Sequence, residues 1–336
     1  MKKFRVGVLG ATGAVGLEMM KILAEREFPI EELVPMASAR SAGKQIDFNG
    51  GKVTVKEARK EAFKGLDIIL GAAENDIAEA FADDIVNAGA VFIDNSSAFR
   101  LNDNVPLVIP EINKEDVKKH CGVIANPNCT TIVSLMAVKP ISDISPVETM
   151  VVSSYQATSG AGINGPIELM AQTKAISEGS DIPAPNVFQY QIAYNVIPQI
   201  GGFNDNGYST EEMKLMNEGR KIMHLPSLKV SCTCVRVPVV RSHSVSIQLV
   251  TKKKVTPQEA MKAVAAFPGD VLKDDLPNSV YPMPLDTSDQ DLVFVGRIRE
   301  DLTNQRGLML WCCGDQIRKG AATNAVQIAE EVIKTL

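Results

Sequence analysis

The sequence is poor in histidine, cysteine and tryptophan, and it has no long apolar run. Its 336 residues include three histidines, six cysteines and one tryptophan. No apolar stretch approaches the roughly 20 residues that a membrane-spanning helix needs. The apolar run behind the basic N-terminal residues is also too short for a signal peptide. We therefore expect a cytoplasmic protein without a membrane segment.

An excess of charge of one sign is also missing. The chain has 35 basic and 40 acidic residues, which give a net charge of −5. No block of five or six like charges occurs, so nothing favours nucleic acid or an anionic membrane as a partner. With 45% hydrophobic and 22% charged residues, the composition is that of a globular protein long enough for two domains.

The cysteines lack the spacing of a disulfide framework or a zinc site. They are sparse in a long chain, which is typical of a reduced compartment. The alternative is a metal site, and its best candidates are Cys232 and Cys234 with His224 and His243. No paired Cys-x-x-Cys or His-x-x-x-His spacing supports zinc there, and we predict no metal site.

The two halves of the chain have different patterns. The first alternates short apolar strands with helices, which is the signature of βαβ units on a parallel sheet. Its predicted strands are 5–9, 33–37, 68–72 and 91–94, and its helices 14–25 and 76–88. From about residue 146 longer alternating strands favour an α+β domain with a mixed or antiparallel sheet. These strands are 147–155, 229–237, 244–251, 291–299 and 308–313, with helices at 166–178, 210–224 and 256–265.

Two further segments connect these halves. Residues 179–208 are rich in Pro, Gly and Asn but also carry aromatic residues. Loops of that length are usually functional or contact-making, so we expect this one to be covered by its own domain or by a second subunit. A last helix over 321–334 is expected to return to the first domain.

A glycine-rich turn follows the first predicted strand and opens the first helix. Its spacing is G-x-x-G-x-x-G. Glycines allow a tight turn and close backbone approach, and the helix N-terminus offers N–H groups to a pyrophosphate. A glycine-rich turn that binds nothing is the alternative. The predicted dinucleotide contacts are Gly10, Thr12, Gly13, Ala14, Val15 and Gly16.

The end of the second predicted strand carries no acidic residue. Ser38, Arg40 and Ser41 stand there instead. An NAD site typically places Asp or Glu at this point for the ribose hydroxyls, whereas a cation accommodates a 2′-phosphate. We therefore expect NADP. A polar surface loop is the alternative for these three residues alone.

Cys129 stands where a short apolar stretch ends and a helix over 130–139 is predicted to begin. N–H groups at a helix N-terminus stabilise negative charge and lower the pKa of a thiol. We therefore predict that Cys129 is a nucleophile. Its acid/base is predicted to be His243, which begins a strand and whose pKa should lie near the working pH. A buried, hydrogen-bonded histidine is the alternative.

Together these motifs resemble the aspartate-semialdehyde dehydrogenase family. They occur in that family's order over essentially the whole chain: the glycine turn, 95–100, 126–130, 155–162, Asn217-Glu218, 236–239 with His243, and 318–322. The resemblance implies an α/β fold, with a Rossmann-type NADP-binding domain at 1–129 and 316–336. It implies an α+β catalytic and dimerisation domain with a mixed sheet at 130–315. The protein would then be a homodimer or homotetramer.

The resemblance also implies a reaction on a small-molecule substrate. This is the NADPH-dependent reductive dephosphorylation of L-4-aspartyl phosphate to L-aspartate 4-semialdehyde, in lysine, threonine and methionine biosynthesis. Cys129 would form a thioacyl intermediate that Gln156 helps to orient. Arg236 would hold the α-carboxylate through a bidentate fork, and Glu218 would pair with the α-ammonium.

Further substrate and cofactor contacts follow from the same resemblance. Arg100 and Lys221 match phosphate-binding positions, and Asn128 belongs with them in the substrate site. The pair Gly219-Arg220 departs from the family's pattern, which puts Lys221 in doubt. The residues that resemble nicotinamide-side contacts are Ser159, Gly160, Gly162 and Asn324.

Three alternatives stay open. N-acetyl-glutamyl-phosphate reductase handles an acylated amine and has no use for Glu218, and a malonyl-CoA reductase needs a site for coenzyme A. A catalytically silent homologue with a binding role would be free to lose its reactive residues. The intact residues that weigh against it are Cys129, Gln156, Arg236 and His243.

Overall fold

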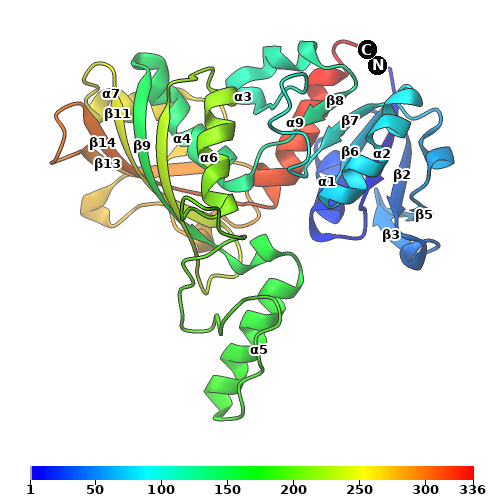
Figure 1. The fold of residues 1–336 in the computed structure, drawn as a ribbon, viewed down its shortest axis with the longest axis horizontal. Helices are drawn as coiled ribbons and strands as arrows, with labels where there is room; N and C mark the ends of the chain where they lie inside the picture. The colour runs from blue at the N-terminus through cyan, green and yellow to red at the C-terminus, as the bar shows by residue number, and fades with distance from the viewer. Residues whose placement is uncertain (1) are drawn as a thin grey trace. The chain divides into compact units, whose positions relative to one another are not determined.

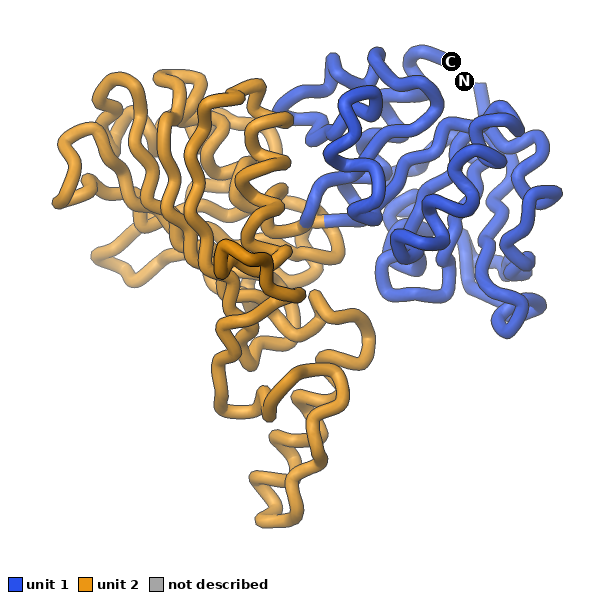
Figure 2. Tube along the Cα trace, viewed as in Figure 1, with its two compact units in different colours: residues 1–128, 321–336 blue, residues 129–320 orange. Residues whose placement is uncertain are grey.

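The computed structural model describes residues 2–336 (Figure 1). The chain divides into two compact units, one formed by the residues up to 128 together with 321–336 and the other by residues 129–320 (Figure 2). Within residues 2–336, none of the helices combines the length and the apolar character that crossing a bilayer requires.

The first unit is built on a six-stranded sheet in the order β5-β2-β1-β6-β7-β8, with every pair parallel. This confirms the parallel sheet predicted from the βαβ pattern. The strands are β1 (Phe4–Leu9), β2 (Ile30–Ala37), β5 (Lys56–Glu57), β6 (Ile68–Gly71), β7 (Val91–Asp94) and β8 (Val123–Ala125). The helices are α1 (Ala14–Glu25), α2 (Asn75–Asn87), α3 (Pro110–Asn113) and α9 (Thr323–Val332).

Helices cover both faces of this parallel sheet. Ile68 and Leu70 pack in one apolar cluster with α1 and α9, whereas Ile69 between them packs with α2 in another. Successive side chains of a strand point to opposite faces, so β6 is buried on both sides. That double burial explains why the strands of this half are continuous apolar runs.

The second unit is built on a six-stranded mixed sheet in the order β10-β9-β11-β14-β13-β12. The pairs β10/β9 and β12/β13 are parallel and the other three are antiparallel. The strands are β9 (Val147–Gln156), β10 (Lys229–Arg236), β11 (His243–Thr251), β12 (Asp270–Leu272), β13 (Val293–Glu300) and β14 (Gly307–Gly314). The helices are α4 (Cys129–Ile144), α5 (Asn164–Glu178), α6 (Thr210–Ile222), α7 (Pro257–Ala266) and α8 (Pro284–Thr287).

Helix α4 is the buried centre of the second unit. It packs on β11, β13 and β14 and is flanked by α6 and α7. The predicted helix over 130–139 is thus confirmed and is longer than expected. Helix α6 begins with a capping box, in which Ser209 and Glu212 each accept the other's backbone N–H. Such a cap fixes the residue at which the helix starts.

Helix α5 projects away from the sheet of its own unit (Figure 1). The long segment after it packs back on the helix: Glu168 accepts the N–H groups of Asn186 and Val187 at 2.7 and 2.6 Å. Phe188 and Ile192 join Leu169 in a small apolar cluster. Part of the segment is therefore covered by its own domain, which was one of the two expectations, whereas Tyr190, Tyr194 and Val196 stay exposed.

Several elements were not predicted from the sequence. A hairpin joins β3 (Gln45–Phe48) to β4 (Gly51–Thr54) through Asn49 and Gly50, both at positive φ. An Asn-Gly pair is the standard signal for this turn. The predicted helix over 321–334 begins earlier, as a π-helix over Arg318–Ala322, and becomes α9 at Thr323.

The departure at Gly219 gives a stability prediction. A Cβ added at Gly219 would meet Leu135 and Leu228 at 3.7 Å, an ordinary apolar contact. Alanine is favoured over glycine inside a helix by about 1 kcal/mol, so Gly219→Ala should raise the free energy of unfolding by up to that amount, measured by urea denaturation. Gly165→Ala is the contrast, because its Cβ would lie 2.1 Å from the carbonyl oxygen of Thr158. Equal effects from the two substitutions would contradict this packing.

Candidate active site

The chain that leads to Cys129 is held by buried asparagines in the first unit. Asn126 donates from Nδ2 to Oδ1 of Asn95 at 2.6 Å and accepts at Oδ1 from Nδ2 of Asn324 at 2.7 Å. Asn324 also donates to the carbonyl of Val108 at 2.9 Å. Asn126 and Asn324 are fully buried, so these amides fix the ends of β7 and β8 to the start of α9. The structure thus places Asn324 inside this network.

Arg100 belongs to the same part of the first unit. Its Nε donates to the carbonyl of Asn126 at 2.9 Å and its Nη2 to the carbonyl of Asn95 at 2.8 Å. The side chain is buried, and so is Asn128. Backbone carbonyls therefore orient the Arg100 guanidinium, which favours a fixed geometry over a solvated surface charge.

Cys129 is the first residue of α4 and lies beside His243. Its Sγ is 3.5 Å from Nε2 of His243, within the distance of a sulfur hydrogen bond. His243 is the first residue of β11 and is fully buried. The other imidazole nitrogen, Nδ1, accepts the backbone N–H of Ala157 at 3.1 Å. The structure therefore brings the predicted nucleophile and the predicted acid/base together.

The protonation of His243 differs from the sequence-based expectation. Burial, with the nearby positive charge of Arg236, lowers the pKa of His243 to about 3, and the carboxylate of Glu211 opposes this shift. An imidazolium without water around it is costly, because burial disfavours the charged form. This lowered pKa lies below the value near the working pH that was expected from the sequence. The sequence showed which histidine was involved but not that it is fully enclosed.

Arg236 lies next to His243 and is anchored through the same backbone segment. Its Nη1 donates to the carbonyl of Ala157 at 2.6 Å, and its Cζ lies 5.8 Å from the centroid of the Phe188 ring. Burial lowers the pKa of Arg236, while Glu211 and the sulfur of Cys129 oppose that shift. A guanidinium stays charged under these conditions, so the site holds a fixed positive charge.

Gln156 connects α4, β9 and α6. Its Nε2 donates to Oγ1 of Thr130 at 2.8 Å and lies 3.3 Å from Oε1 of Glu211. Glu211 is buried and pairs through Oε2 with Lys214 at 3.0 Å. Glu211 and Lys214 are not among the site residues predicted from the sequence. In the sequence Glu211 and Lys214 stand three residues apart, and the predicted pair, Glu218 and Lys221, has the same spacing.

The chosen pair, Glu218 and Lys221, lies further along α6. Glu218 is seven positions beyond Glu211, and Lys221 is seven positions beyond Lys214. A helix rises about 1.5 Å per residue, so the displacement is roughly 10 Å along the axis. Glu218 is buried on the same helix. It is Glu211 whose charge acts on both Arg236 and His243.

The glycine turn has the shape of a phosphate cradle. A Cβ at Gly10 would lie 2.5 Å from the carbonyl oxygen of Ala72, and one at Gly16 would lie 2.3 Å from that of Gly10. Packing therefore demands both glycines. At Gly13 the nearest atom to such a Cβ is 3.5 Å away, so the protein itself leaves that space open. Gly13 is also the N-cap of α1 and offers no capping side chain. These residues fit a bound pyrophosphate.

The residues around that cradle are only partly enclosed. Thr12, Ala14 and Val15 are half-buried. After β2, Ser38 and Arg40 are exposed, whereas Ser41 is buried and accepts from Nζ of Lys44 at 3.4 Å. Arg40 makes no hydrogen bond or ion pair with other residues in the range 2–336. Its charge is thus available to an anionic ligand.

Ser159 and Gly160 lie in a short 3₁₀ turn that follows β9. Gln316 donates to Oγ of Ser159 and accepts the N–H of Ser242 at 2.9 Å. A Cβ at Gly160 would lie 2.7 Å from Nη1 of Arg236 and 3.0 Å from Cε1 of His243. The turn therefore lies directly against both residues.

The cysteines other than Cys129 show no comparable setting. Cys232 and Cys234 share a face of β10, with sulfurs 3.6 Å apart, and the hydrogen bond to Cys234, together with burial, raises the pKa of the Cys232 thiol. All six cysteines are free thiols. Within residues 2–336, no three His, Cys, Asp or Glu side chains converge as metal ligands.

Known proteins resemble the chain over nearly its whole length. Residues 5–120 match the family described as semialdehyde dehydrogenase, NAD binding domain, and residues 138–319 match its dimerisation domain. An aspartate-semialdehyde dehydrogenase of Aquifex aeolicus (strain VF5) is 49% identical over 98% of both chains. One from Bacillus subtilis (strain 168) is 45% identical over 98% of this chain and 97% of its own. The crystal structure of aspartate semialdehyde dehydrogenase II from Vibrio cholerae, complexed with ASA, has a TM-score of 0.96 at 41% identity and covers 99% of both chains.

Gly160 gives a prediction about this site. Gly160→Ala would press on the far end of the Arg236 side chain, which can move at little cost to the fold. We expect the free energy of unfolding to change little, while kcat/KM falls about 100-fold because small misplacements at a reacting centre cost that much. Gly202→Ala is the control, since nothing lies within 4 Å of its added Cβ. A fully active Gly160→Ala enzyme would contradict the close packing described above.

Proposed function

Because the chain belongs to the aspartate-semialdehyde dehydrogenase family, we propose that it converts L-4-aspartyl phosphate to L-aspartate 4-semialdehyde with NADPH through a thioacyl enzyme. The observation that carries this proposal is the 3.5 Å contact between Sγ of Cys129 and Nε2 of His243, with the guanidinium of Arg236 alongside. A thiol in this setting suits acyl transfer. The biosynthetic role in making lysine, threonine and methionine belongs to the same proposal.

Cys129 acts as the acyl acceptor. Two features favour its thiolate: the N–H groups at the start of α4 and the positive charge of Arg236. The sulfur attacks the acyl carbon, the bond to the phosphate oxygen breaks, and a thioester remains on Cys129. The amide of Gln156, tied to Thr130 next to Cys129, orients the acyl group. After reduction, the oxyanion re-forms a carbonyl and the C–S bond breaks.

Buried charges hold the amino-acid end of the substrate. We assign the α-carboxylate to Arg236, as a bidentate guanidinium partner, and the α-ammonium to Glu211. Lys214, paired with Glu211, takes the role first given to Lys221. This assignment replaces Glu218 and Lys221, because they lie about two turns further along α6. Arg100 and Asn128 remain proposed substrate contacts.

NADPH, when bound, supplies the hydride. We assign residues 1–129 and 316–336 to binding it and residues 130–315 to catalysis and dimerisation. The glycines of the first turn receive the pyrophosphate, and Ser38, Arg40 and Ser41 receive the 2′-phosphate. Ser159 and Gly160 are assigned to the nicotinamide side. Asn324, which is enclosed by Asn126 and Val108, would then support that side through its network.

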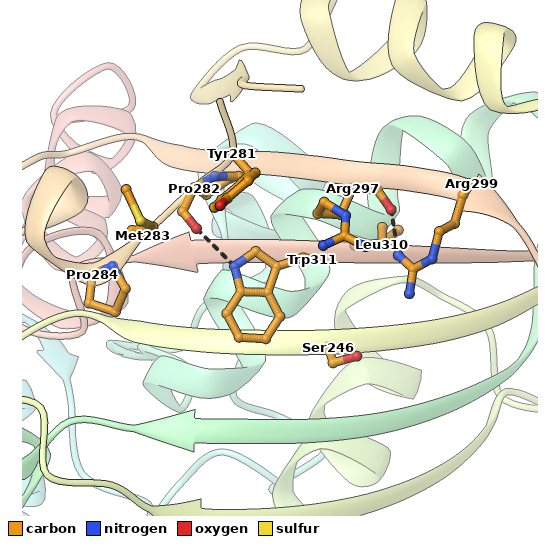
Figure 3. Close-up of a pocket in the computed structure, with 9 residues that line it drawn as sticks. All are labelled: Ser246, Tyr281, Pro282, Met283, Pro284, Arg297, Arg299, Leu310 and Trp311. Atoms are coloured by element: carbon orange, nitrogen blue, oxygen red, sulfur yellow. Dashed lines mark hydrogen bonds between the residues drawn. The ribbon is translucent and has the colours of Figure 1, made fainter. Parts of the chain in front are cut away.

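We further propose a homodimer of cytoplasmic location, formed through the open face of the second unit's sheet. Helices α4, α6 and α7 form one layer on one face, while Val151 and Tyr155 on the other face stay exposed. Trp311 lies 5.5 Å from the ring of Tyr155 and lines a hollow of about 300 Å³ (Figure 3). A second copy of the chain is the proposed occupant, because the matched dimerisation domain spans this sheet.

The covalent step can be tested with Cys129→Ala. The reverse reaction is followed by NADPH absorbance, starting from aspartate semialdehyde, phosphate and NADP⁺. We expect the rate to fall at least about 1,000-fold, since loss of a nucleophile is among the costliest changes in an enzyme. Cys121→Ala removes an exposed thiol and should leave the rate unchanged. A wild-type rate from Cys129→Ala would refute the covalent mechanism.

Glu211→Gln and Glu218→Gln distinguish the two assignments for the ammonium partner. Losing a charged hydrogen bond costs about 1.5–3 kcal/mol, so Glu211→Gln should lower kcat/KM for the free amino-acid substrate roughly 10- to 150-fold. The same change should also reduce the preference for the free over the N-acetylated substrate. Glu218→Gln should keep that preference. If Glu218→Gln alone abolished it, the original assignment would be right.

Arg40→Ala tests the choice of cofactor. We expect KM for NADPH to rise on the order of tenfold and KM for NADH to stay constant, because only NADPH carries the 2′-phosphate. Lys3→Ala is the control, since it removes the same charge next to the first residue of β1, at the opposite end of the strand from the glycine turn. Equal increases for both cofactors would show that Arg40 does not distinguish them.

A further inference from the structure

The guanidinium of Arg236 is buried but keeps donors available. Its Nη1 donates to the carbonyl of Ala157 at 2.6 Å. In the part of the chain that the structure describes, residues 2–336, its other N–H groups make no hydrogen bond. A guanidinium carries five N–H donors in a planar fork, and a bidentate carboxylate uses two of them. The donors that a carboxylate needs are therefore still open.

Phe188 covers the face of this guanidinium. Cζ of Arg236 lies over the Phe188 ring, 5.8 Å from its centroid, which is within the range of a cation–π contact. Phe188 is itself buried, with 8% of its surface exposed. A guanidinium that stacks on an aromatic ring still directs its N–H fork outward in its own plane. The ring can therefore exclude water from the guanidinium without competing for its donors.

The Phe188 ring is packed against helix α5. A Cβ added at Gly165 would lie 3.4 Å from Cζ of Phe188, so the missing side chain at this position leaves room for the end of the ring. Phe188 also belongs to the small apolar cluster that α5 forms with the segment after it. The ring thus contacts α5 and Arg236 at the same time, and this packing opposes its turning away.

Two buried side chains of α5 hold the backbone that carries Phe188. The carboxylate of Glu168 accepts the N–H groups of residues 186–188 at 2.7, 2.6 and 3.4 Å. Oε1 of Gln172, one turn further along α5, accepts those of residues 192 and 193 at 3.0 and 3.1 Å. Buried backbone N–H groups of an irregular segment need such partners. The helix therefore serves as a template for residues 186–193.

The same segment is also tied directly to Arg236. Ile197 and Arg236 exchange both backbone hydrogen bonds, at 2.9 and 2.8 Å, as an isolated antiparallel bridge. The chain from 186 to 197 thus begins on α5 and ends on the residue whose guanidinium it covers. It lies within the long segment 179–208, whose length predicted a functional or contact-making role.

We propose that Phe188 is a positioning residue for recognition of the substrate's α-carboxylate, because its ring fixes the plane of the Arg236 guanidinium and keeps water away from the ion pair that forms there. Helix α5, through Glu168, holds the ring in place. This inference rests on the proposed function, since it takes Arg236 as the partner of the α-carboxylate. Ion pairs strengthen where water is excluded, so Phe188 should matter only for substrates that carry this carboxylate.

Two substrates distinguish this role from a general structural one. Aspartate semialdehyde carries the α-carboxylate, and 3-aminopropanal is the same aldehyde without it. Phe188→Leu keeps an apolar side chain in the cluster but removes the ring. In the reverse reaction we expect kcat/KM for aspartate semialdehyde to fall roughly 5- to 30-fold, the range for loss of a desolvated cation–π contact. For 3-aminopropanal we expect no change. Equal losses with both substrates, or no loss with either, would overturn the proposal.

The control and the anchor variant use the same two substrates. Phe203→Leu is the matched control, because Phe203 lies in the same long segment but is 59% exposed, and it should change neither rate. Glu168→Gln removes the charge at which the N–H groups of residues 186–188 point. It should reproduce the selective loss, and it supplies the comparison if Phe188→Leu does not fold. Wild-type selectivity in Glu168→Gln would refute the role of α5.

Phenylglyoxal, which modifies arginine side chains, measures the cover over Arg236 without any turnover. Its reaction is followed at the peptide that contains Arg236. We expect slow modification in the wild type and in Phe203→Leu, and faster modification in Phe188→Leu. Equal rates in the wild type and Phe188→Leu would contradict the proposal. If the wild type does not prefer aspartate semialdehyde to 3-aminopropanal, the assignment of the α-carboxylate to Arg236 fails instead, so the two failures are distinguishable.

Discussion

The site depends on the contact between the sulfur of Cys129 and the imidazole of His243. Each partner begins a rigid element: Cys129 starts the buried helix α4, and His243 starts β11, which lies between β9 and β14. Gly320 and Gly314 lie against α4, where a larger side chain would not fit. A Cβ at Gly320 would be 2.9 Å from that of Cys129, and one at Gly314 would be 2.9 Å from the side chain of Val133.

Buried charge is the second constraint. Arg236, Glu211 and His243 are all buried, and unpaired charges are costly in a buried site. The fold provides the guanidinium of Arg236, the carboxylate of Glu211, which contacts Gln156 and pairs with Lys214, and an imidazole whose pKa is lowered by burial. The positive charge of Arg236 acts on the sulfur of Cys129, which favours a thiolate. The arrangement also leaves both charged groups rigid before a zwitterionic substrate arrives.

Much of the fold and part of the site could be predicted from the sequence. Helix α1 and strand β7 have the predicted bounds. The glycine turn marks where α1 begins, and β7 is a continuous apolar run because it is buried on both faces. Cys129 and His243 could be singled out because a helix start is visible in the sequence and histidines are rare. The β3–β4 hairpin also has a signal in the sequence, the Asn49-Gly50 pair, but it was not among the predicted elements.

The remaining features depend on tertiary position. Residues seven apart on a helix lie on nearly the same face, with a drift of about 20°, so the pairs at 211/214 and 218/221 look alike in sequence. Only the packing of α6 shows which pair lies beside Gln156. The lowered pKa of His243 likewise depends on how completely the ring is enclosed, and enclosure leaves no trace in the amino-acid pattern.

The central claim is that Cys129 accepts the acyl group. Mass spectrometry of the enzyme incubated with aspartate semialdehyde and NADP⁺ without phosphate tests it most directly, because the thioester then has no phosphate to receive its acyl group. We expect one aspartyl group on the peptide that contains Cys129, removed by hydroxylamine, and none on the other five cysteines. An adduct at another residue, or no adduct while NADPH still forms, would contradict it.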